Sequence, residues 1–243
     1  MNTFTSEELY VLAALTKREF LIGVEGNTLE ENMADLKGLF KRNYAELEAR
    51  GLVEYRMDGT LLLNREVRDS IRVLNKADSV VVVVANINGK RVKTHYLSYG
   101  NKVCRLTEDG PKYSLEIITD YDKESVLESC GIDLKSTPVT ELSIPLDTLN
   151  QLNESFSSFD EGEGSRILSG LTQDSRISSL MRDCILKKNH SFVMKEYKKI
   201  GHHIVNTNNL ILRFIGNNTI RFSVSDGTNV NVSIYEGGVS DHE

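Results

Sequence analysis

The sequence predicts an α+β fold in which a central antiparallel sheet is flanked by helices. Two runs of short β-rich segments, residues 79–119 and 191–235, are interrupted by small polar turns, and connections this short join antiparallel neighbours. Helical periodicity precedes each run. The two halves therefore share one order, a helix followed by a meander, which predicts a pseudo-twofold duplication whose strands join into one long sheet.

Residues 1–76 are predicted to form a winged-helix-like N-terminal module. Its first helix carries an apolar stripe at helical spacing: Leu9, Leu12, Leu15 and Phe20. Thr28 and Glu31 have the spacing of a capping box for a second helix, which ends where Gly51 supplies a left-handed C-cap. Leu52 is then expected to fold back on that helix.

A hairpin and a third helix complete this module. Alternation over residues 52–63 and the Asp58-Gly59 pair predict two strands joined by a tight turn. Asn64 is a suitable N-cap for a helix over 64–76. Because this helix runs into the next strand without a linker, we expect the module to pack on the rest of the chain as one compact unit.

Residues 77–135 are predicted to hold the first meander and a helix, and residues 136–243 the second half. The first meander has expected strands at 79–87, 91–98, 102–107 and 112–119, followed by a helix that Asp122 caps. The second half has an expected helix capped by Thr172 and strands at 191–198, 202–206, 210–216, 219–225 and 228–235, with a turn at Asn208-Asn209. Residues 133–142 are expected to cross between the halves, and residues 153–167, rich in Ser, Gly and acidic side chains, to form a mobile surface loop.

The composition is that of a globular protein. The 243 residues carry a net charge of −6 and are 40% hydrophobic, which suits a sizeable core. No apolar run reaches the length of a membrane helix, and the first ten residues lack the basic and apolar regions of a secretory signal. We therefore expect a cytoplasmic protein without membrane insertion. Cys104, Cys130 and Cys184 have no paired spacing and predict buried free thiols.

The sequence predicts no catalytic, cofactor or metal site. The carboxylates are scattered without an acid–base pair, and only His202 and His203 among the histidines are adjacent. Neighbours in a strand point to opposite faces, so these two side chains would not share one metal. We therefore expect a protein that is not an enzyme, with dispersed catalytic residues as the alternative that leaves no motif.

The helix–helix–hairpin order raises a second alternative, a winged-helix transcriptional regulator. Nucleic-acid binding requires clustered cations, whereas residues 1–75 carry thirteen acidic side chains against ten basic ones. Domains of this shape also mediate protein–protein contacts. We therefore expect no nucleic acid among the partners.

The first half of the chain follows a definite order of segments. FTSEELYVLAAL is followed by LIGV, then by LEARGLVEYRMDGTLLLN, then by a helix and a β-rich run from Ser79 to Ile118. This order resembles the EspG-like chaperones of type VII (ESX) secretion, and Arg50, Gly51 and Leu52 match the Arg-Gly-Leu helix end of that family. The second half resembles it in architecture alone. The chain has no tryptophan, which actinobacterial members often carry near the N-terminus, and this indicates a relative from the Firmicutes branch.

The resemblance implies a cytosolic, non-enzymatic chaperone or adaptor. Such a protein binds helical-hairpin substrates of the WXG/LXG or PE/PPE type, keeps them soluble and delivers them for export by a type VII secretion system. It implies no cofactor. A homodimer is left open.

The partner is expected to bind at the turns of the first meander. Six residues lie near Gly89 and Gly100 in the sequence: Lys90, Arg91, Tyr96, Tyr99, Asn101 and Lys102. Tyrosines beside polar loops bury a large ring while the hydroxyl stays wet, which suits a transient interface. The alternative is that Tyr96 belongs to the core and the lysines protect a sheet edge. The second-half helices around Ile177 and Met181 are the next candidate surface.

Overall fold

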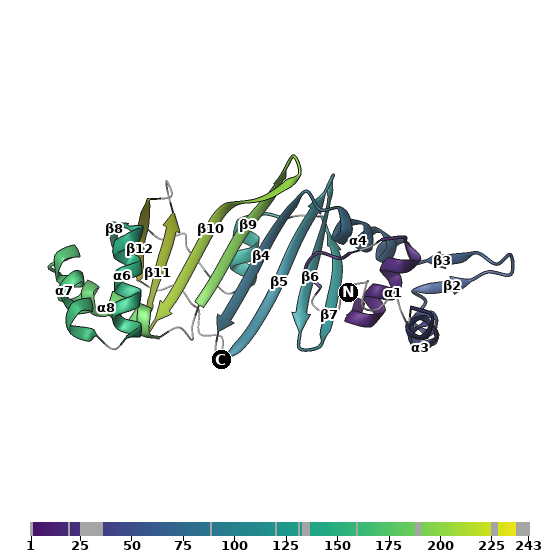
Figure 1. Cartoon of the computed structure of the whole chain (residues 1–243), viewed down its shortest axis with the longest axis horizontal. Helices are drawn as coiled ribbons and strands as arrows, with labels where there is room; N and C mark the ends of the chain where they lie inside the picture. Colours follow the sequence, from purple (N-terminus) through teal and green to yellow (C-terminus); the bar gives the residue numbers. More distant parts are fainter. Residues whose placement is uncertain are drawn as a thin grey trace. The chain divides into compact units, whose positions relative to one another are not determined.

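The chain is an α+β protein built on one large antiparallel sheet, and the predicted fold class is confirmed (Figure 1). The computed structural model describes residues 2–18, 20–24, 36–87, 89–119, 121–130, 132, 137–158, 160–187, 191–224 and 228–236. The ten strands follow the order β1-β7-β6-β5-β4-β9-β10-β11-β12-β8, and a separate two-stranded sheet pairs β2 with β3.

The two halves of the chain repeat one order of elements. The first half contains β1 (Asn2–Thr5), α1 (Ser6–Leu15), α3 (Leu36–Ala49), β2 (Val53–Tyr55), β3 (Leu61–Leu63), α4 (Arg65–Lys76), β4 (Ser79–Ile87), β5 (Lys90–Tyr99), β6 (Lys102–Asp109) and β7 (Lys112–Ile118). The second contains α5 (Lys123–Ser129), β8 (Thr140–Pro145), α6 (Leu146–Ser157), α7 (Glu161–Leu171), α8 (Ser175–Leu186), β9 (Ser191–Ile200), β10 (His203–Ile215), β11 (Asn218–Val224) and β12 (Asn229–Glu236). Apart from α5 and the β2–β3 hairpin, which have no counterpart in the other half, both halves place an edge strand before the helices and a four-stranded meander after them, and the last strand of the meander pairs with the edge strand.

By its internal contacts the chain divides into two compact units. Unit 1 comprises Met1–Val82, Val92–Tyr121 and Glu196–Val205, and unit 2 comprises Val83–Arg91, Asp122–Lys195 and Asn206–Glu243. Each unit has its own apolar core between helices and sheet.

In unit 1, strand β1 and helix α1 meet at Thr5. The strand pairs with β7, so that Thr5 lies opposite Lys112. The Thr5 hydroxyl accepts the backbone N–H of Glu8 at 3.2 Å, and the Glu8 carboxylate accepts the backbone N–H of Thr5 at 2.7 Å. This capping box begins the helix at the last residue of the strand. Strand β1 is not evident from the sequence, because its four residues include one buried side chain, Phe4, and show no alternation of apolar and polar side chains.

Glu8 is a buried carboxylate whose charge is matched by Arg50. The Glu8 side chain is 4% exposed, and its Oε1 accepts a hydrogen bond from Arg50 Nη1 at 2.7 Å. Arg50 also donates to the carbonyl of Thr3 and lies 5.1 Å from the centroid of the Phe4 ring. A residue at the end of α3 thereby holds β1 and the first turn of α1.

The core of unit 1 forms where α1 and α4 cover the sheet. Fully buried side chains come from both helices and from the strands beneath them: Leu9, Leu12, Ile71, Leu74, Leu97 and Leu106. The predicted end of the second helix is confirmed, since Gly51 has φ +66° and Leu52 N–H donates to the carbonyl of Leu47 at 2.9 Å. Asn64 caps α4 as predicted, accepting the backbone N–H groups of Glu66 and Val67.

Two expectations for the N-terminal module do not hold or fall outside the description. Phe20 is 56% exposed, so it does not belong to the buried stripe of Leu9 and Leu12. It follows the end of α1 at Leu15 and therefore has left the helical period. Thr28 and Glu31 lie outside the described residues.

In unit 2, α6 and α8 pack against the sheet, and α7 packs on these two helices. The core joins Leu152, Phe156, Leu168 and Met181 of the helices to Ile220, Val232 and Ile234 of the strands. Strand β8 pairs with β12 and runs directly into α6, since Pro145 ends the strand and occupies the N-cap of the helix.

The expectation of a mobile loop over 153–167 was wrong. Residues 153–157 belong to α6 and residues 161–167 to α7, and Asp160 caps α7 by accepting the N–H of Glu163. Phe156 is 2% exposed and anchors α6, and Gly164 of α7 lies against its ring. The composition misled because most of the polar and acidic residues of the segment are exposed, while Phe156 and Gly164 carry the packing between the two helices.

Three predicted boundaries in the second half also differ from those in the structure. Asn208-Asn209 is not a turn, because β10 is continuous from His203 to Ile215. Thr172 ends α7, and the cap of α8 is Asp174, whose side chain accepts the N–H groups of Arg176 and Ile177. The tract 133–142 reaches into the edge strand β8, whose first residue is Thr140.

Gly164 tests the close contact between α6 and α7. A Cβ at this position would lie 2.7 Å from Cζ of the buried Phe156 ring. Overpacking of this kind costs about 1–3 kcal/mol, so Gly164→Ala should lower the free energy of unfolding by about that amount in urea titration. Gly170→Ala, in the same helix with no atom within 4 Å of its Cβ, is the control. It should leave stability unchanged or raise it by up to about 1 kcal/mol. Equal midpoints for the two variants would contradict the contact.

Arg50 tests the charge balance of unit 1. Arg50→Ala leaves the Glu8 carboxylate buried without its cation, and we expect a loss of about 2–3 kcal/mol, less than for a fully buried pair because Arg50 is 30% exposed. Glu46→Ala is the control, since Glu46 is exposed and lies 4.0 Å from Arg50, and it should change stability by less than about 0.5 kcal/mol. An Arg50 variant as stable as the control would refute the assigned role.

Candidate functional site

The six residues predicted to bind a partner lie at two ends of one strand and along it. Lys90 and Arg91 are exposed at the start of β5. Tyr99, Asn101 and Lys102 lie at its other end, in the turn to β6. The ten-residue strand separates the two groups by roughly 30 Å. They do not form one cluster.

Tyr96 lies between these groups and is buried. It is 7% exposed, and the centroid of its ring is 5.0 Å from that of Tyr121. A side chain in this environment packs within the fold, which agrees with the core alternative for Tyr96.

Tyr99 and Lys102 are both occupied by contacts with α4. The Tyr99 ring lies 5.6 Å from the Arg72 guanidinium carbon and 5.9 Å from Lys76 Nζ, and such cation–π contacts are favourable. Lys102 Nζ lies 2.6 Å from Asp69 Oδ2. The hydrogen bond from Lys102 lowers the pKa of the Asp69 carboxyl, and the charges of Lys102 and nearby arginines act in the same direction. The turn therefore presents cations beside an aromatic ring.

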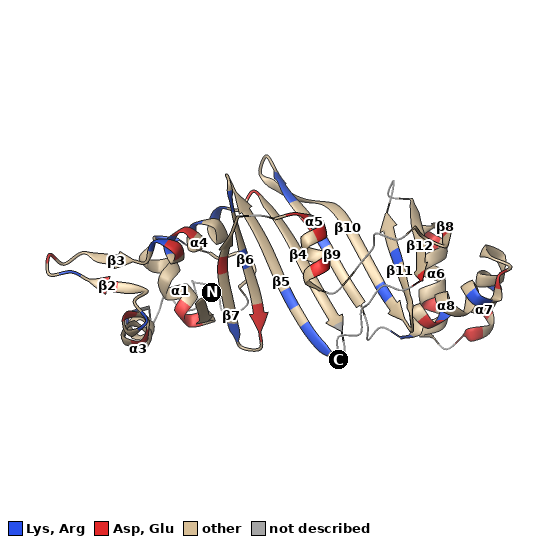
Figure 2. Ribbon diagram, turned by 180° about the vertical axis from the view of Figure 1, so that it is seen from behind, with Lys and Arg blue, Asp and Glu red and all other residues tan. Residues whose placement is uncertain are grey.

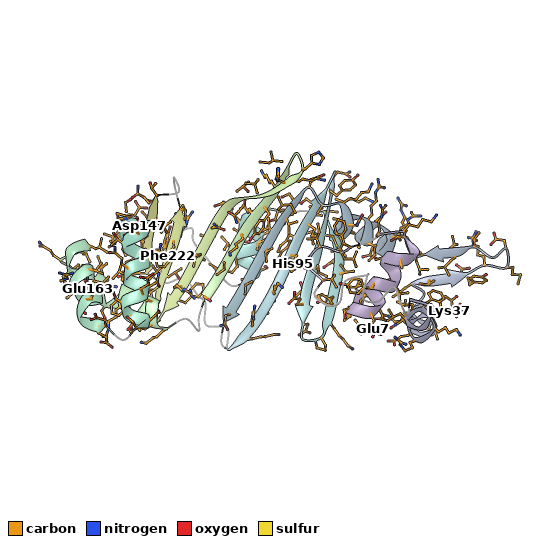
Figure 3. All side chains as sticks on the ribbon, viewed as in Figure 1. Glu7, Lys37, His95, Asp147, Glu163 and Phe222 are labelled. Carbon is orange, nitrogen blue, oxygen red and sulfur yellow. The ribbon has the colours of Figure 1, made fainter. Side chains whose placement is uncertain are left out.

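An apolar pocket in unit 2 is the second candidate surface. It has a volume of about 180 Å³ and lies between α6, α8 and the strands β10, β11 and β12. Its lining is mostly aliphatic and aromatic: Leu146, Leu149, Ile185, Ile211, Phe222, Val224 and Val230, with Asn153, Cys184, Asn209 and Arg213. Figure 3 marks Phe222 on β11, beside α6, which carries Asp147. Val224 at its rim is 45% exposed, so the apolar wall continues to the surface.

The polar side chains of the pocket are few and offer no reactive group. Asn153 donates to the carbonyl of Leu149 at 3.0 Å. Burial raises the pKa of the Cys184 thiol to about 12, against the opposing effect of Arg213, so the thiol stays neutral. Small-molecule sites usually measure about 300–1,000 Å³, and this smaller pocket suits one or two side chains of a macromolecular partner. Its apolar lining suits the burial of an apolar side chain.

The sequence does not reveal this pocket as a site. Ile177 and Met181, which mark the next candidate surface in the sequence, are buried in the core, and α8 contributes Cys184 and Ile185 to the pocket instead. Its lining residues show only the periodicity of core positions, and strand alternation does not indicate where a helix stops covering a sheet. Half-buried side chains such as Leu149 and Ile211 differ from core residues only in their solvent exposure, which the sequence does not show.

In the part of the chain that the structure describes, no three His, Cys, Asp or Glu side chains are grouped so that they could hold a metal ion. Of the described helices, none combines the length and the apolar composition needed to cross a membrane.

Comparison with known proteins shows a similarity in fold. No family model and no curated sequence matches the chain. Among solved structures, it is similar to the type VII secretion system chaperone EspG5 of Mycobacterium tuberculosis, solved in complex with a PE25–PPE41 dimer. The TM-score is 0.70 at 12% sequence identity, covering 95% of this chain and 89% of that one. The chain therefore has an EspG-like fold.

Proposed function

We propose that this protein is a non-enzymatic, cytoplasmic chaperone that binds a helical-hairpin substrate of a type VII secretion system and keeps it soluble for export. The observation that carries the proposal is the fold shared with EspG5 along nearly the full length of both chains. EspG5 was solved with a PE25–PPE41 dimer, and we infer a substrate of the PE/PPE or WXG/LXG type for this chain. The lack of tryptophan supports assignment to the Firmicutes branch of that system.

The apolar pocket of unit 2 is the surface that we propose for the substrate. An amphipathic helix docks by placing apolar anchors, one turn apart, into a hydrophobic groove. The pocket offers such a groove, with the half-buried Leu146, Leu149 and Ile211 at its walls and the exposed Val224 at its rim. A helix tip that is apolar on one face would be desolvated here, which protects it from aggregation in the cytoplasm.

Arg213 adds a positive charge to the proposed surface. It lines the same pocket as Phe222 and Val224, and it lies close enough to Cys184 to act on the pKa of that thiol. A cation at the edge of an apolar groove favours partners that carry a carboxylate or a helix C-terminus beside their anchors. The substrate tip is thus expected to combine aliphatic side chains with one acidic group.

The regulator alternative has less support. Helix α3 interleaves the exposed Lys37 and Lys41 with the exposed Glu46 and Glu48, and such a mixed face does not concentrate the positive charge that phosphates require. The β2–β3 wing is likewise mixed.

The pocket is tested by placing a charge at its rim. Val224→Glu should weaken capture of the co-expressed helical-hairpin substrate at least about tenfold in Kd, because it puts a carboxylate in the desolvated contact. The residue is exposed, so folding should be unaffected. Val139→Glu is the matched control: Val139 belongs to unit 2, is 56% exposed and does not line the pocket. Undiminished capture by a folded Val224→Glu variant would exclude this surface.

The predicted residues at the β5–β6 turn are ranked by the same assay. Tyr99→Ala combined with Lys102→Glu should weaken capture if the substrate also contacts the turn. The two changes remove contacts with α4 and place a carboxylate beside Asp69, so the urea midpoint should fall, and capture is compared under conditions in which the variant is folded. Full capture by this double variant, together with loss in Val224→Glu, would assign binding to the pocket.

A further inference from the structure

The β9–β10 hairpin differs in charge from the rest of this acidic protein. The chain carries a net charge of −6, yet no Asp or Glu occurs between Tyr197 and Val224. The end of the hairpin carries Lys198 and Lys199 on one strand and the pair His202-His203 at the turn.

The tip of this hairpin also exposes aliphatic side chains. Ile200 is 60% exposed, Ile204 69% and Val205 41%. Figure 3 shows the side chains of the tip extending from the ribbon. Three branched aliphatic residues at the end of a hairpin are costly to leave in water, and their grouping indicates a surface that they enter.

The end of the hairpin that carries Lys199 lies beside the start of β4, next to the β5–β6 turn and α4. Lys199 N–H donates to the carbonyl of Asp78 at 2.8 Å, and Asp78 N–H donates to the carbonyl of Ser98 at 2.9 Å. Tyr99 follows Ser98 and lies under Arg72 and Lys76. All of these residues belong to unit 1, so the hairpin tip and the exposed face of α4 lie along one edge of that unit.

Helix α4 adds a stripe of cations to this edge. Arg65, Arg68, Arg72 and Lys76 recur at helical spacing and are all exposed. Two acidic residues of α4 lie within the stripe: Asp69 is paired with Lys102, and Glu66 is exposed. Figure 2 shows the basic residues in blue on α4, at the start of β6 and at the β9–β10 tip.

We call this edge the basic rim and define it by seven cations: Arg65, Arg68, Arg72, Lys76, Lys102, Lys198 and Lys199. Three acidic side chains, Glu66, Asp69 and Asp78, lie among them, which leaves four positive charges before the histidines are counted.

We propose that the basic rim binds an anionic membrane surface and that the aliphatic hairpin tip enters its interfacial layer. Basic side chains gain energy near anionic headgroups, and apolar side chains beside them gain more by entering the boundary with the acyl chains. A lipid surface fits better than a protein partner because the aliphatic side chains protrude, whereas a protein would need a matching cavity. Proposed substrate capture uses unit 2, so the rim would bring the chaperone to the membrane independently of that proposal.

The test is flotation of the full chain with lipid vesicles. We expect binding to phosphatidylcholine–phosphatidylglycerol vesicles, little binding to phosphatidylcholine alone, and weaker binding at raised salt. Lys198→Glu with Lys199→Glu should lower the partition coefficient at least about tenfold, since each basic residue near the surface contributes several-fold. Ile200→Ser with Ile204→Ser should lower it several-fold and leave the salt dependence intact.

Two control variants match these changes elsewhere in unit 1. Lys37→Glu with Lys41→Glu on α3 makes the same change in net charge, and Met57→Ser removes an apolar side chain that is 109% exposed at the wing tip. Both should bind as the unmodified protein does, and urea midpoints should confirm that every variant is folded.

Several outcomes would overturn the proposal. These are absence of binding to anionic vesicles at low salt, equal loss in the Lys37 and Lys41 control, or binding to a duplex DNA or a polyglutamate probe in place of vesicles. Capture of the helical-hairpin substrate by the rim variants is measured in parallel. Intact capture with lost vesicle binding separates failure of the rim from failure of the proposed chaperone function.

Discussion

The constraint on which the architecture depends is that an edge strand leads directly into the helices that cover its half of the sheet. Thr5 ends β1 and caps α1, and Pro145 ends β8 and occupies the cap of α6. Each set of helices therefore follows an edge strand and leads into a meander, and the last strand of that meander pairs with the same edge strand. The helices of each half are thus attached to their part of the sheet both before and after the helical segment. Because tertiary packing supplies most of the stability of a helix, these helices do not need a strongly apolar face. Helix α3, whose exposed face carries both basic and acidic side chains, is therefore tolerated.

The order of the helices and strands could be predicted from the sequence more accurately than their boundaries. Turns with a glycine of positive φ, such as Gly51 and Gly100, were visible because few other residues suit that conformation. The helices over 153–167 were not, because one buried ring and one close glycine hold them together, and neither makes a period. The Asn208-Asn209 pair suggested a turn, yet these residues lie within the continuous strand β10, whose neighbours in the sheet are β9 and β11.

The candidate site was harder to predict than the fold for a physical reason. Lys102 and Tyr99 were chosen as exposed groups beside a turn, and the folded chain gives each of them a partner on α4, which lies more than twenty residues earlier. The pocket collects residues from α6, α8 and three strands that are up to about eighty residues apart. Local patterns record which side chains are apolar, whereas a site depends on which apolar side chains remain uncovered after packing.

The pairing of β1 with β7 has a consequence for synthesis. Asn2 pairs with Leu115, so the first strand leaves the ribosome long before its partner exists. At about 5–20 residues per second the delay is roughly 5 to 20 s. During that time β1 lacks its partner strand, whereas the Glu8 carboxylate waits only for Arg50, which follows 42 residues later and can hold the first turn of α1 before β7 is made. The second half repeats the delay between Thr140 and Ile234, which makes late edge closure a common step in the maturation of both halves.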